Sequence, residues 1–376
     1  MLAWFNSTIN IGNGIFLYIL LQTIAANVCK SQILNIKKPN TTLKDIANKL
    51  GISVSTVSRA LRNHPLIKQE TVELVKETAA EMEYFPDNVA RNLQKKSTNT
   101  IGVIVPEIRH DFFSSAVDGI EDRAFQSGYT IIVTKSNEDY EREVLNSRTL
   151  VSHRVAGIIA SVAQSTVDGE HFMAVGRRGI PVVLFDRVLE DLDVSKVIVD
   201  DYVGAFNSTK HLIECGYKRI AHLAGPSNLK ISIERERGYR AAIVDAGLPL
   251  DEDLIVEVEL DEVHGAIGLR QLLDLESRPD AIFAVNDPVA VGAHKEIRSK
   301  GFQIPKDIGI TGFSNNPITE MIEPPLTTVD QHGYKMGQVA ADLLLQEIEG
   351  DHSEWSPQTR IVETELIIRQ SSACKV

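Results

Sequence analysis

Four small hydroxyl residues and two arginines occur close together in the stretch GISVSTVSRALRNH, residues 51–64. They are Ser53, Ser55, Thr56 and Ser58, followed by Arg59 and Arg62. Hydroxyl groups can bond base edges or phosphates, and a guanidinium group can bond both major-groove acceptors of guanine. Serine, threonine and valine are poor helix formers, so a helix that only had to fold would use other residues. The composition therefore favours a surface that contacts nucleic acid.

This surface needs a helix to present it, and the flanking residues predict a helix-turn-helix. Thr42 can cap a first helix, in which Asp45 suits the positively charged first turn. Gly51 can end that helix, and Ser53 can cap the second one. A third helix is expected at about Gln69–Glu83. Small residues at the start of the second helix would let its backbone approach base edges in the major groove.

Helical spacing divides the second helix into two faces. The inward face is expected to hold Val54, Val57, Ala60 and Leu61. The outward face is expected to hold Ser55, Thr56, Ser58, Arg59 and Arg62. A three-helix domain whose polar face is merely solvated stays open as the alternative.

The segment DNVARNLQKKSTNT, which follows Pro86, mixes apolar and basic residues but is too short and polar for a domain core. Val89, Ala90 and Leu93 would share one face of a helix. Apolar side chains beside basic ones suit a wedge that enters a DNA minor groove and kinks the duplex. A helical linker with one packed face is the alternative interpretation.

From Ile101 onward the chain alternates apolar strands with amphipathic stretches. The strands read IGVIV, YTIIV, VAGIIA, PVVLF, KVIVD, RIAHLAG, AIFAV and IGITGF. Buried strands separated by helices predict parallel α/β sheets, and eight strands over about 270 residues suit two Rossmann-like subdomains. Ligands in such sheets lie at the carboxyl ends of the strands. No GxGxxG motif follows a strand, so a dinucleotide site has little support.

Charge is distributed unevenly along the 376 residues, whose formal net charge is −12. Residues 37–100 hold 11 Lys and Arg against 7 Asp and Glu, whereas residues 101–376 hold 27 against 44. A mildly basic segment on an acidic body is compatible with a nucleic-acid module joined to a sensor or an enzyme. The cysteines Cys29, Cys215 and Cys374 have no CxxC spacing, so we expect a reducing compartment, no disulfide framework and no cysteine zinc site.

Residues 1–40 are a separate extension. Its stretch GIFLYILLQTIAANVC is apolar but contains Gln22, Thr23 and Asn27, and it is shorter than the ~20 apolar residues of a spanning helix. No lysine or arginine precedes Lys30, so the basic start of a signal peptide is missing. We expect a disordered extension or an upstream stretch that is not native protein. A membrane anchor is the less favoured alternative.

The motifs TLKDIANKLGISVSTVSRAL, YFPDNVARNL and TIGVIVPEI, with others as far as ETELIIR, closely resemble the LacI/GalR family of bacterial repressors. The resemblance covers nearly everything from Thr41 onward. It implies a DNA-binding headpiece at residues 41–86 and a hinge helix at 87–97 that folds on operator DNA. It also implies a periplasmic-binding-protein-like core at 98–376.

Within the core, the resemblance implies an N-subdomain that mediates dimerisation, a C-subdomain, and a ligand between them. The expected boundaries are about 100–198 and 328–351 for the N-subdomain, and about 199–327 and 352–370 for the C-subdomain. The effector positions fall on Phe112, Phe113, Asp186, Arg235 and Asp287. A guanidinium fork and carboxylate acceptors suit a polyhydroxylated ligand. Two alternatives stay open: Arg235 could pair with Glu234 or Glu236 on a solvated helix, and Asp287 could cap the helix that follows.

The resemblance also implies roles for the DNA-contacting residues. Base-reading positions fall on Val54, Ser55 and Arg59, and phosphate contacts mainly on Thr56 and Ser58. The minor-groove wedge falls on Leu93, with Val89 and Ala90 beside it.

Three features depart from the family pattern. Lys68 stands where a serine often caps the third helix, SNNP follows GF where a glycine–aspartate turn is common, and Arg237 precedes Gly238. They leave the DNA-binding role intact and the ligand identity open.

We therefore predict a sequence-specific DNA-binding transcriptional regulator, by its resemblance a repressor, controlled by a sugar or related polyhydroxylated effector. Its expected partners are double-stranded operator DNA, the effector and a second copy of the chain, with a tetramer as the alternative to a homodimer. We expect a cytoplasmic location, no cofactor and no metal. A periplasmic or membrane-tethered solute-binding protein would have no use for a helix-turn-helix. An α/β enzyme is disfavoured, with no catalytic residue expected, because HxH, HExxH and GxSxG spacings are missing.

Overall fold

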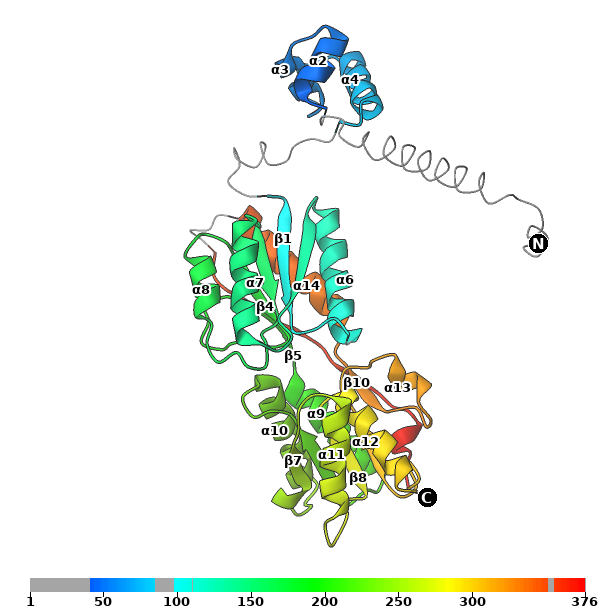
Figure 1. Cartoon of the computed structure of the whole chain (residues 1–376). Helices are drawn as coiled ribbons and strands as arrows, with labels where there is room; N and C mark the ends of the chain where they lie inside the picture. Colours follow the sequence, from blue (N-terminus) through cyan, green and yellow to red (C-terminus); the bar gives the residue numbers. More distant parts are fainter. Residues whose placement is uncertain (1–40, 85–97, 110, 351–354, 376) are drawn as a thin grey trace, which may run out of the picture. The chain divides into compact units, whose positions relative to one another are not determined.

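The structure, a computed structural model, describes residues 41–84, 98–109, 111–350 and 355–375. The chain divides into two compact units, Met1–Arg91 with the helical headpiece and Asn92–Val376 with a larger α/β core (Figure 1). The extension and the predicted wedge residues Val89, Ala90 and Leu93 lie outside the described residues. No helix within the described ranges is long and apolar enough to cross a membrane.

Three helices form the headpiece: α2 (Leu43–Leu50), α3 (Val54–Ala60) and α4 (Gln69–Glu81). Each contributes to one small core, made of Ile46, Ala47, Val57, Ala60, Val72, Val75 and Ala79. The predicted helix-turn-helix is confirmed, and α4 ends two residues before the expected Glu83.

Local hydrogen bonds explain where these helices begin and end. Thr42 and Asp45 form a reciprocal capping box at α2, and Gly51 ends that helix with a φ of 65°, which glycine adopts without strain. Ser53 caps α3, because its Oγ accepts a hydrogen bond from the Thr56 N–H at 3.1 Å. Helix α4 begins after Lys68 without a side-chain cap.

The first subdomain of the core is a six-stranded parallel sheet with the order β11-β5-β4-β3-β1-β2. Its strands are β1 (Thr100–Val105), β2 (Thr130–Lys135), β3 (Gly157–Ala160), β4 (Val182–Phe185), β5 (Ser195–Val199) and β11 (Thr359–Val362). Helices α6 (Asp111–Gln126) and α14 (Gly333–Glu349) cover one face, and α7 (Tyr140–Ser152) and α8 (Glu170–Gly176) cover the other (Figure 1). Strands β3 and β4 are buried along their whole length, as a sheet covered on both faces requires.

The second subdomain is a four-stranded parallel sheet with the order β7-β6-β8-β9. Its strands are β6 (Ile220–Ala224), β7 (Ile255–Glu257), β8 (Ala281–Ala284) and β9 (Gly309–Thr311). Helices α9 (Asp201–Glu214) and α10 (Lys230–Asp245) pack on one face, and α11 (Glu262–Leu273) and α12 (Asp287–Ser299) on the other. The short helices η1 (Glu252–Leu254), α13 (Ile318–Met321) and η2 (Gln370–Ser372) flank this sheet. All eight predicted strands are present, so the predicted α/β class is confirmed.

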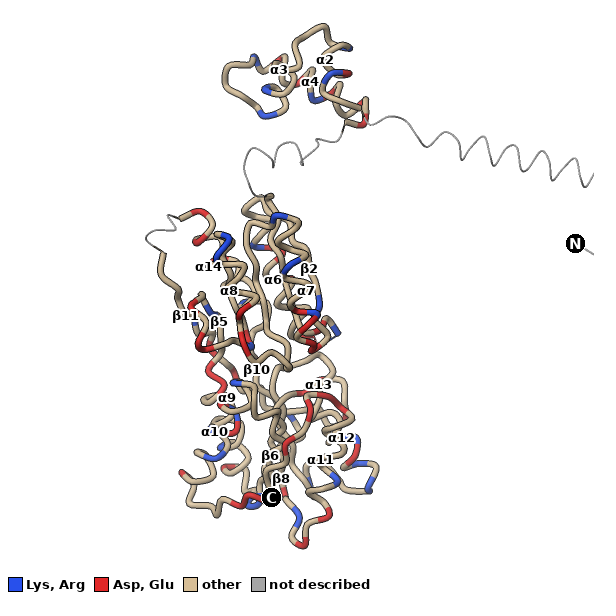
Figure 2. The backbone as a smooth tube through the Cα atoms, turned by 60° about the vertical axis from the view of Figure 1, so that its left-hand side comes forward, with Lys and Arg blue, Asp and Glu red and all other residues tan. Residues whose placement is uncertain are grey.

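Acidic and basic residues are interspersed along both subdomains (Figure 2).

The chain passes three times between the subdomains: after β5, between β10 (Thr328–Asp330) and α14, and between β11 and β12 (Glu365–Ile367). The structure differs here from the expected boundaries. Strand β11, expected in the C-subdomain, pairs with β5 of the first sheet, and β10, expected in the N-subdomain, pairs with β12 and packs on α9. Strands this short have no sequence signal for which sheet they join, because pairing is decided by tertiary packing.

A disulfide joins Cys215, at the end of α9, to Cys374, with 4.1 Å between the Cα atoms. The cysteine spacing predicted no disulfide framework, and the structure nevertheless joins this one pair. The two cysteines lie 159 residues apart, and their spacing could not show that the last described segment packs beside α9. The Tyr217 hydroxyl donates to the Ala373 carbonyl at 2.9 Å, and the Lys375 N–H donates to the Cys215 carbonyl at 2.9 Å.

Candidate functional site

Helix α3 exposes most of the residues expected to contact DNA. Ser53, Val54, Ser55, Arg59 and Arg62 are exposed, while Thr56 and Ser58 are half-buried. Val54 differs from the face assigned to it by helical spacing, because 43% of its surface is exposed, whereas Val57 is wholly buried. Side chains tilt toward the start of a helix, so Val54, the first residue of α3, points beyond the packed turn.

The hydroxyl groups at the start of α3 form a connected cluster. Ser53 Oγ lies 2.8 Å from both Ser55 Oγ and Thr56 Oγ1. Hydroxyls can rotate to donate to a phosphate oxygen or to accept from a base. In the described headpiece the ion pair joins Lys49 to Glu81, and it does not involve Arg59 or Arg62. The exposed face of α3 therefore combines small hydrogen-bonding groups with guanidinium groups that no carboxylate neutralises there.

A second candidate site lies in the cleft between the two subdomains of the core. Its inner cavity has a volume of about 60 Å³, which is room for a few water molecules. The cavity is lined by Phe112, Phe113, Glu138, Asp186, Arg187, Ile231, Arg235, Leu260, Asn286, Pro288, Ser314, Asn316 and Gln331. Four of the five expected effector positions are thus brought together, and Asp287 does not line the cavity.

Arg235 reaches the cavity from α10 and is almost wholly buried. Its Nε donates to Asp201 Oδ1 at 2.8 Å, and its Nη2 lies 2.7 Å from the same oxygen. Its Nη1 donates to the Val285 carbonyl at 2.7 Å, and the guanidinium carbon lies 3.7 Å from the centre of the Phe313 ring. Burial raises the pKa of Asp201 to about 6, although Arg235 beside it acts in the opposite direction.

The alternative role for Arg235, pairing on a solvated helix, is wrong. Glu234 instead pairs with Arg237, and Glu236 pairs with Arg240. Helical spacing could have argued against both pairs, because residues one position apart on a helix do not face each other, but it could not show that Arg235 is buried.

Asp186 follows β4 and lines the cavity in a strained backbone conformation. Its φ is 60°, a left-handed value that costs a non-glycine residue energy and that often marks functional sites. One of its carboxylate oxygens accepts a hydrogen bond from Gln331 Nε2 at 3.3 Å. Burial raises the pKa of Asp186, while Arg187 and Arg235 lower it.

Asp287 is wholly buried behind the cavity wall, between the lining residues Asn286 and Pro288. Its carboxylate accepts hydrogen bonds from Thr328 Oγ1 at 2.6 Å and from the Asn316 N–H at 2.8 Å. Burial raises its pKa to about 6. The alternative role as a helix cap belongs to Asn286 instead, whose side chain accepts from the Val289 N–H.

The sequence reasoning missed Glu138 and Arg187, which form an ion pair in the cavity wall. Arg187 Nη1 donates to both Glu138 carboxylate oxygens, at 2.9 and 2.8 Å, and the Gln164 N–H donates to the same carboxylate at 2.8 Å. Glu138 comes three residues after β2, so the rule that ligands sit at the carboxyl ends of strands could have pointed to it.

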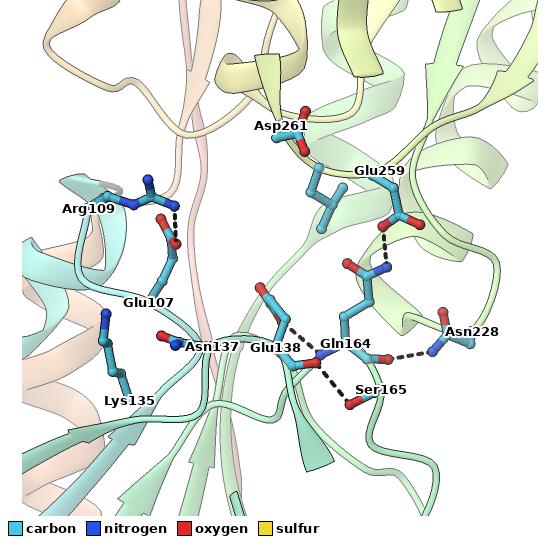
Figure 3. Close-up of a pocket in the computed structure, with 11 residues that line it drawn as sticks. Glu107, Arg109, Lys135, Asn137, Glu138, Gln164, Ser165, Asn228, Glu259 and Asp261 are labelled. Atoms are coloured by element: carbon cyan, nitrogen blue, oxygen red, sulfur yellow. Dashed lines mark hydrogen bonds and ion pairs between the residues drawn. The ribbon is translucent and has the colours of Figure 1, made fainter. Parts of the chain in front are cut away.

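The cleft widens beyond the inner cavity into an outer chamber of about 920 Å³ (Figure 3). Glu138 and Leu260 line both spaces. Gln164 spans the chamber, because its side-chain amide donates to the Glu259 carboxylate and its backbone carbonyl accepts from the Asn228 side-chain amide at 2.7 Å (Figure 3). The described residues hold no cluster of His, Cys, Asp or Glu that suits a metal ion.

Two family models match the chain in succession. Residues 42–87 match bacterial regulatory proteins of the lacI family, and residues 98–370 match the periplasmic binding proteins and sugar binding domain of the LacI family.

Individual relatives match over most of the chain. It is 34% identical over 314 residues to the HTH-type transcriptional repressor PurR of Vibrio atlanticus (strain LGP32), which covers 83% of this chain and 94% of that protein. It is 32% identical over 338 residues to the HTH-type transcriptional repressor CytR of Escherichia coli (strain K12), which covers 89% and 98%. Its structure resembles the lac repressor dimer bound to operator and the anti-inducer ONPF, with a TM-score of 0.79, 26% identity and coverage of 89% and 100%.

Proposed function

The chain belongs to the LacI family, and from that premise we propose which of its residues read operator DNA and which hold the effector. Repressors of this family bind operator DNA and small-molecule effectors as dimers, so the chain is a DNA-binding transcriptional repressor under effector control. Operator DNA as the partner accords with a cytoplasmic location.

Helix α3 enters the major groove in this proposal, where Val54, Ser55 and Arg59 contact bases and Thr56 and Ser58 contact phosphates. The observation that supports it is the exposed face of α3, on which Arg59 has no carboxylate partner within the described residues. Ser53 and Arg62 flank this face and add contacts to the backbone of the duplex. The wedge role of Leu93, with Val89 and Ala90, stays a prediction, because these residues lie outside the described part of the chain.

The effector in this proposal is a sugar or a related polyhydroxylated metabolite that reaches into the inner cavity from the outer chamber, because the inner cavity alone has room for only a few water molecules. Two buried polar atoms of the cavity lining have no hydrogen-bond partner within the described residues, the donor Arg187 Nε and the acceptor Asn316 Oδ1. A hydroxyl group both donates and accepts, so hydroxyls of one ligand can satisfy both atoms. Phe112 on one side and Pro288 on the other supply apolar surface for the faces of its ring.

Arg59→Ala tests the DNA-reading role. With an operator selected from random DNA, we expect about 1–3 kcal/mol of lost affinity, or roughly 5- to 150-fold, because a bidentate base contact is removed. Affinity for random DNA should change much less. Lys49→Ala is the matched control, because Lys49 is a headpiece cation already paired with Glu81. An equal loss on operator and random DNA would show that Arg59 contacts phosphate only.

A screen of neutral sugars and nucleosides against the full chain tests the effector role. A ligand at 100 times its Kd should add about 2.7 kcal/mol of stability and should also change operator affinity. A stabilising sugar whose binding survives Arg235→Met and Asn316→Ala unchanged would place the effector outside the inner cavity.

A further inference from the structure

The two arginines that line the inner cavity are both neutralised by carboxylates of the chain itself. Arg187 donates to both oxygens of Glu138, and Arg235 donates to Asp201. Anionic groups such as phosphates bind proteins through arginine forks that lack another anionic partner. In this cavity both forks are occupied, so neither presents an uncompensated positive charge to a ligand.

Further carboxylates make the cavity still less suitable for an anion. Asp186 lines it, and Asp287 lies directly behind its wall. Within the described residues both accept hydrogen bonds from uncharged groups, the amide of Gln331 for Asp186 and the Thr328 hydroxyl for Asp287. Carboxylates therefore outnumber cations around the cavity, and a phosphorylated ligand would meet net repulsion in a poorly solvated space.

Glu138 and Leu260 each line both the inner cavity and the outer chamber of the cleft. Asn137 and Glu138 both adopt left-handed backbone conformations, with φ of 53° and 61°, which is costly for residues other than glycine. The strained turn is held in place because the Glu138 carbonyl accepts from Ser165 Oγ at 2.9 Å and its carboxylate accepts from the Gln164 N–H (Figure 3). The turn therefore keeps the Glu138 carboxylate against Arg187.

We propose that Glu138 is a specificity-determining residue that restricts the effector to uncharged molecules, such as free sugars or nucleosides, by neutralising Arg187. The proposal rests on the proposed function, because it takes the inner cavity as the effector site. A neutral ligand can still use the arginine, because Arg187 Nε keeps a free donor for a hydroxyl or carbonyl oxygen. A phosphate ester loses the strong ionic contact that would offset its desolvation.

Inorganic phosphate is the probe that tests this proposal, because it requires no knowledge of the natural effector. Its binding to the full-length protein is measured by calorimetry and thermal shift, against sodium chloride of equal ionic strength. Glu138→Gln removes the carboxylate while keeping the size of the side chain. We expect it to bind phosphate at least about tenfold more tightly than the wild type, since a charged hydrogen bond to a free guanidinium contributes on this scale.

Glu259→Gln is the matched control. It removes one negative charge from the same cleft, but Glu259 is bonded to the Gln164 amide and to no arginine within the described residues. It should leave phosphate binding at the wild-type level. Adding Arg187→Gln to Glu138→Gln should abolish the gain.

Three results would overturn the proposal. In the first, a folded Glu138→Gln variant binds phosphate no more tightly than the wild type. In the second, Glu259→Gln gains as much phosphate affinity as Glu138→Gln. In the third, the wild type already binds phosphate and Arg187→Gln removes that binding. If Glu138→Gln does not fold, the wild type decides: D-ribose 5-phosphate binding more tightly than D-ribose in the cleft refutes the proposal, and the reverse order supports it. Operator binding is measured separately, so its failure would count against the proposed function rather than against the charge of the cavity.

Discussion

Arg235 and Asp201 form a buried ion pair whose removal one residue at a time should destabilise the core strongly. Both side chains are more than nine-tenths buried, and the guanidinium nitrogens lie 2.7 and 2.8 Å from one carboxylate oxygen. Removing one partner of such a pair leaves an uncompensated buried charge, which costs about 3–5 kcal/mol. We therefore expect Arg235→Met and Asp201→Ala each to lower the free energy of unfolding of the core by about that amount near neutral pH.

Replacing both residues together should cost less than either single change. Burial raises the pKa of Asp201 to about 6 even with Arg235 beside it, so the attraction does not fully offset the cost of removing the carboxylate from water. Apolar replacement of a buried pair with that balance is often neutral or stabilising. Because each single change costs about 3–5 kcal/mol and the double change should cost less than either, the double-mutant cycle should show a favourable coupling of at least about 3 kcal/mol.

The same pKa fixes the sign of the pH dependence. The folded state holds the Asp201 proton up to about pH 6, whereas the unfolded chain releases it near pH 4. The contribution of this group to stability is therefore full below about pH 4 and is lost as the pH rises through 6, an effect of about 3 kcal/mol. Protonated Asp201 needs no cation, so the cost of Arg235→Met should shrink from neutral pH to about pH 5.

Urea unfolding of the full chain, followed by far-UV and near-UV circular dichroism at both pH values, measures these differences. Glu236→Gln is a control, because its partner Arg240 is also paired with Glu252. Ion pairs exposed to solvent contribute little to the free energy of unfolding. Strictly additive single changes, or a cost of Arg235→Met that is the same at both pH values, would refute the reasoning.

Two further predictions concern packing and cross-linking in the core. Gly238→Ala should destabilise the core by about 1–3 kcal/mol, because the added Cβ would lie 2.3 Å from the Tyr202 carbonyl oxygen. Gly176→Ala is the control, because the space around Gly176 is open. Equal melting temperatures of the two variants would contradict the close contact between the helices. Reduction of the Cys215–Cys374 disulfide should lower the melting temperature, and the chain-entropy model for a loop of this length sets an upper limit of about 5 kcal/mol on the lost free energy of unfolding. The melting temperature of a Cys374→Ser variant should not change with the reductant. If reduction leaves the melting temperature of the wild type unchanged, hydrogen bonds alone hold the segment.

Local patterns in the sequence were sufficient for the headpiece and for most of the core. Thr42, Gly51 and Ser53 act within one turn of the helices they delimit, so their effects depend on neighbours along the chain. The eight predicted strands are mainly runs of apolar residues, as expected for strands in a covered parallel sheet, although β2 at the edge of its sheet is only partly buried. The outward position of Arg59 on α3 also follows from helical spacing.

Tertiary structure decided the features that depend on distant residues. Asp201, Val285 and Phe313 are brought to Arg235 from three other segments, so no spacing could distinguish a buried arginine from a surface one. Helical spacing placed Val54 inward, yet its direction is set by where α3 begins relative to the packed turn. The pairing of Glu138 with Arg187 joins two strand ends that are 49 residues apart, and charge in the cleft is the sum of such pairings. The sequence determined which groups are present, and only packing decided which of them remain free to meet a ligand, because ion pairs in a poorly solvated cavity depend on distances of a few ångströms.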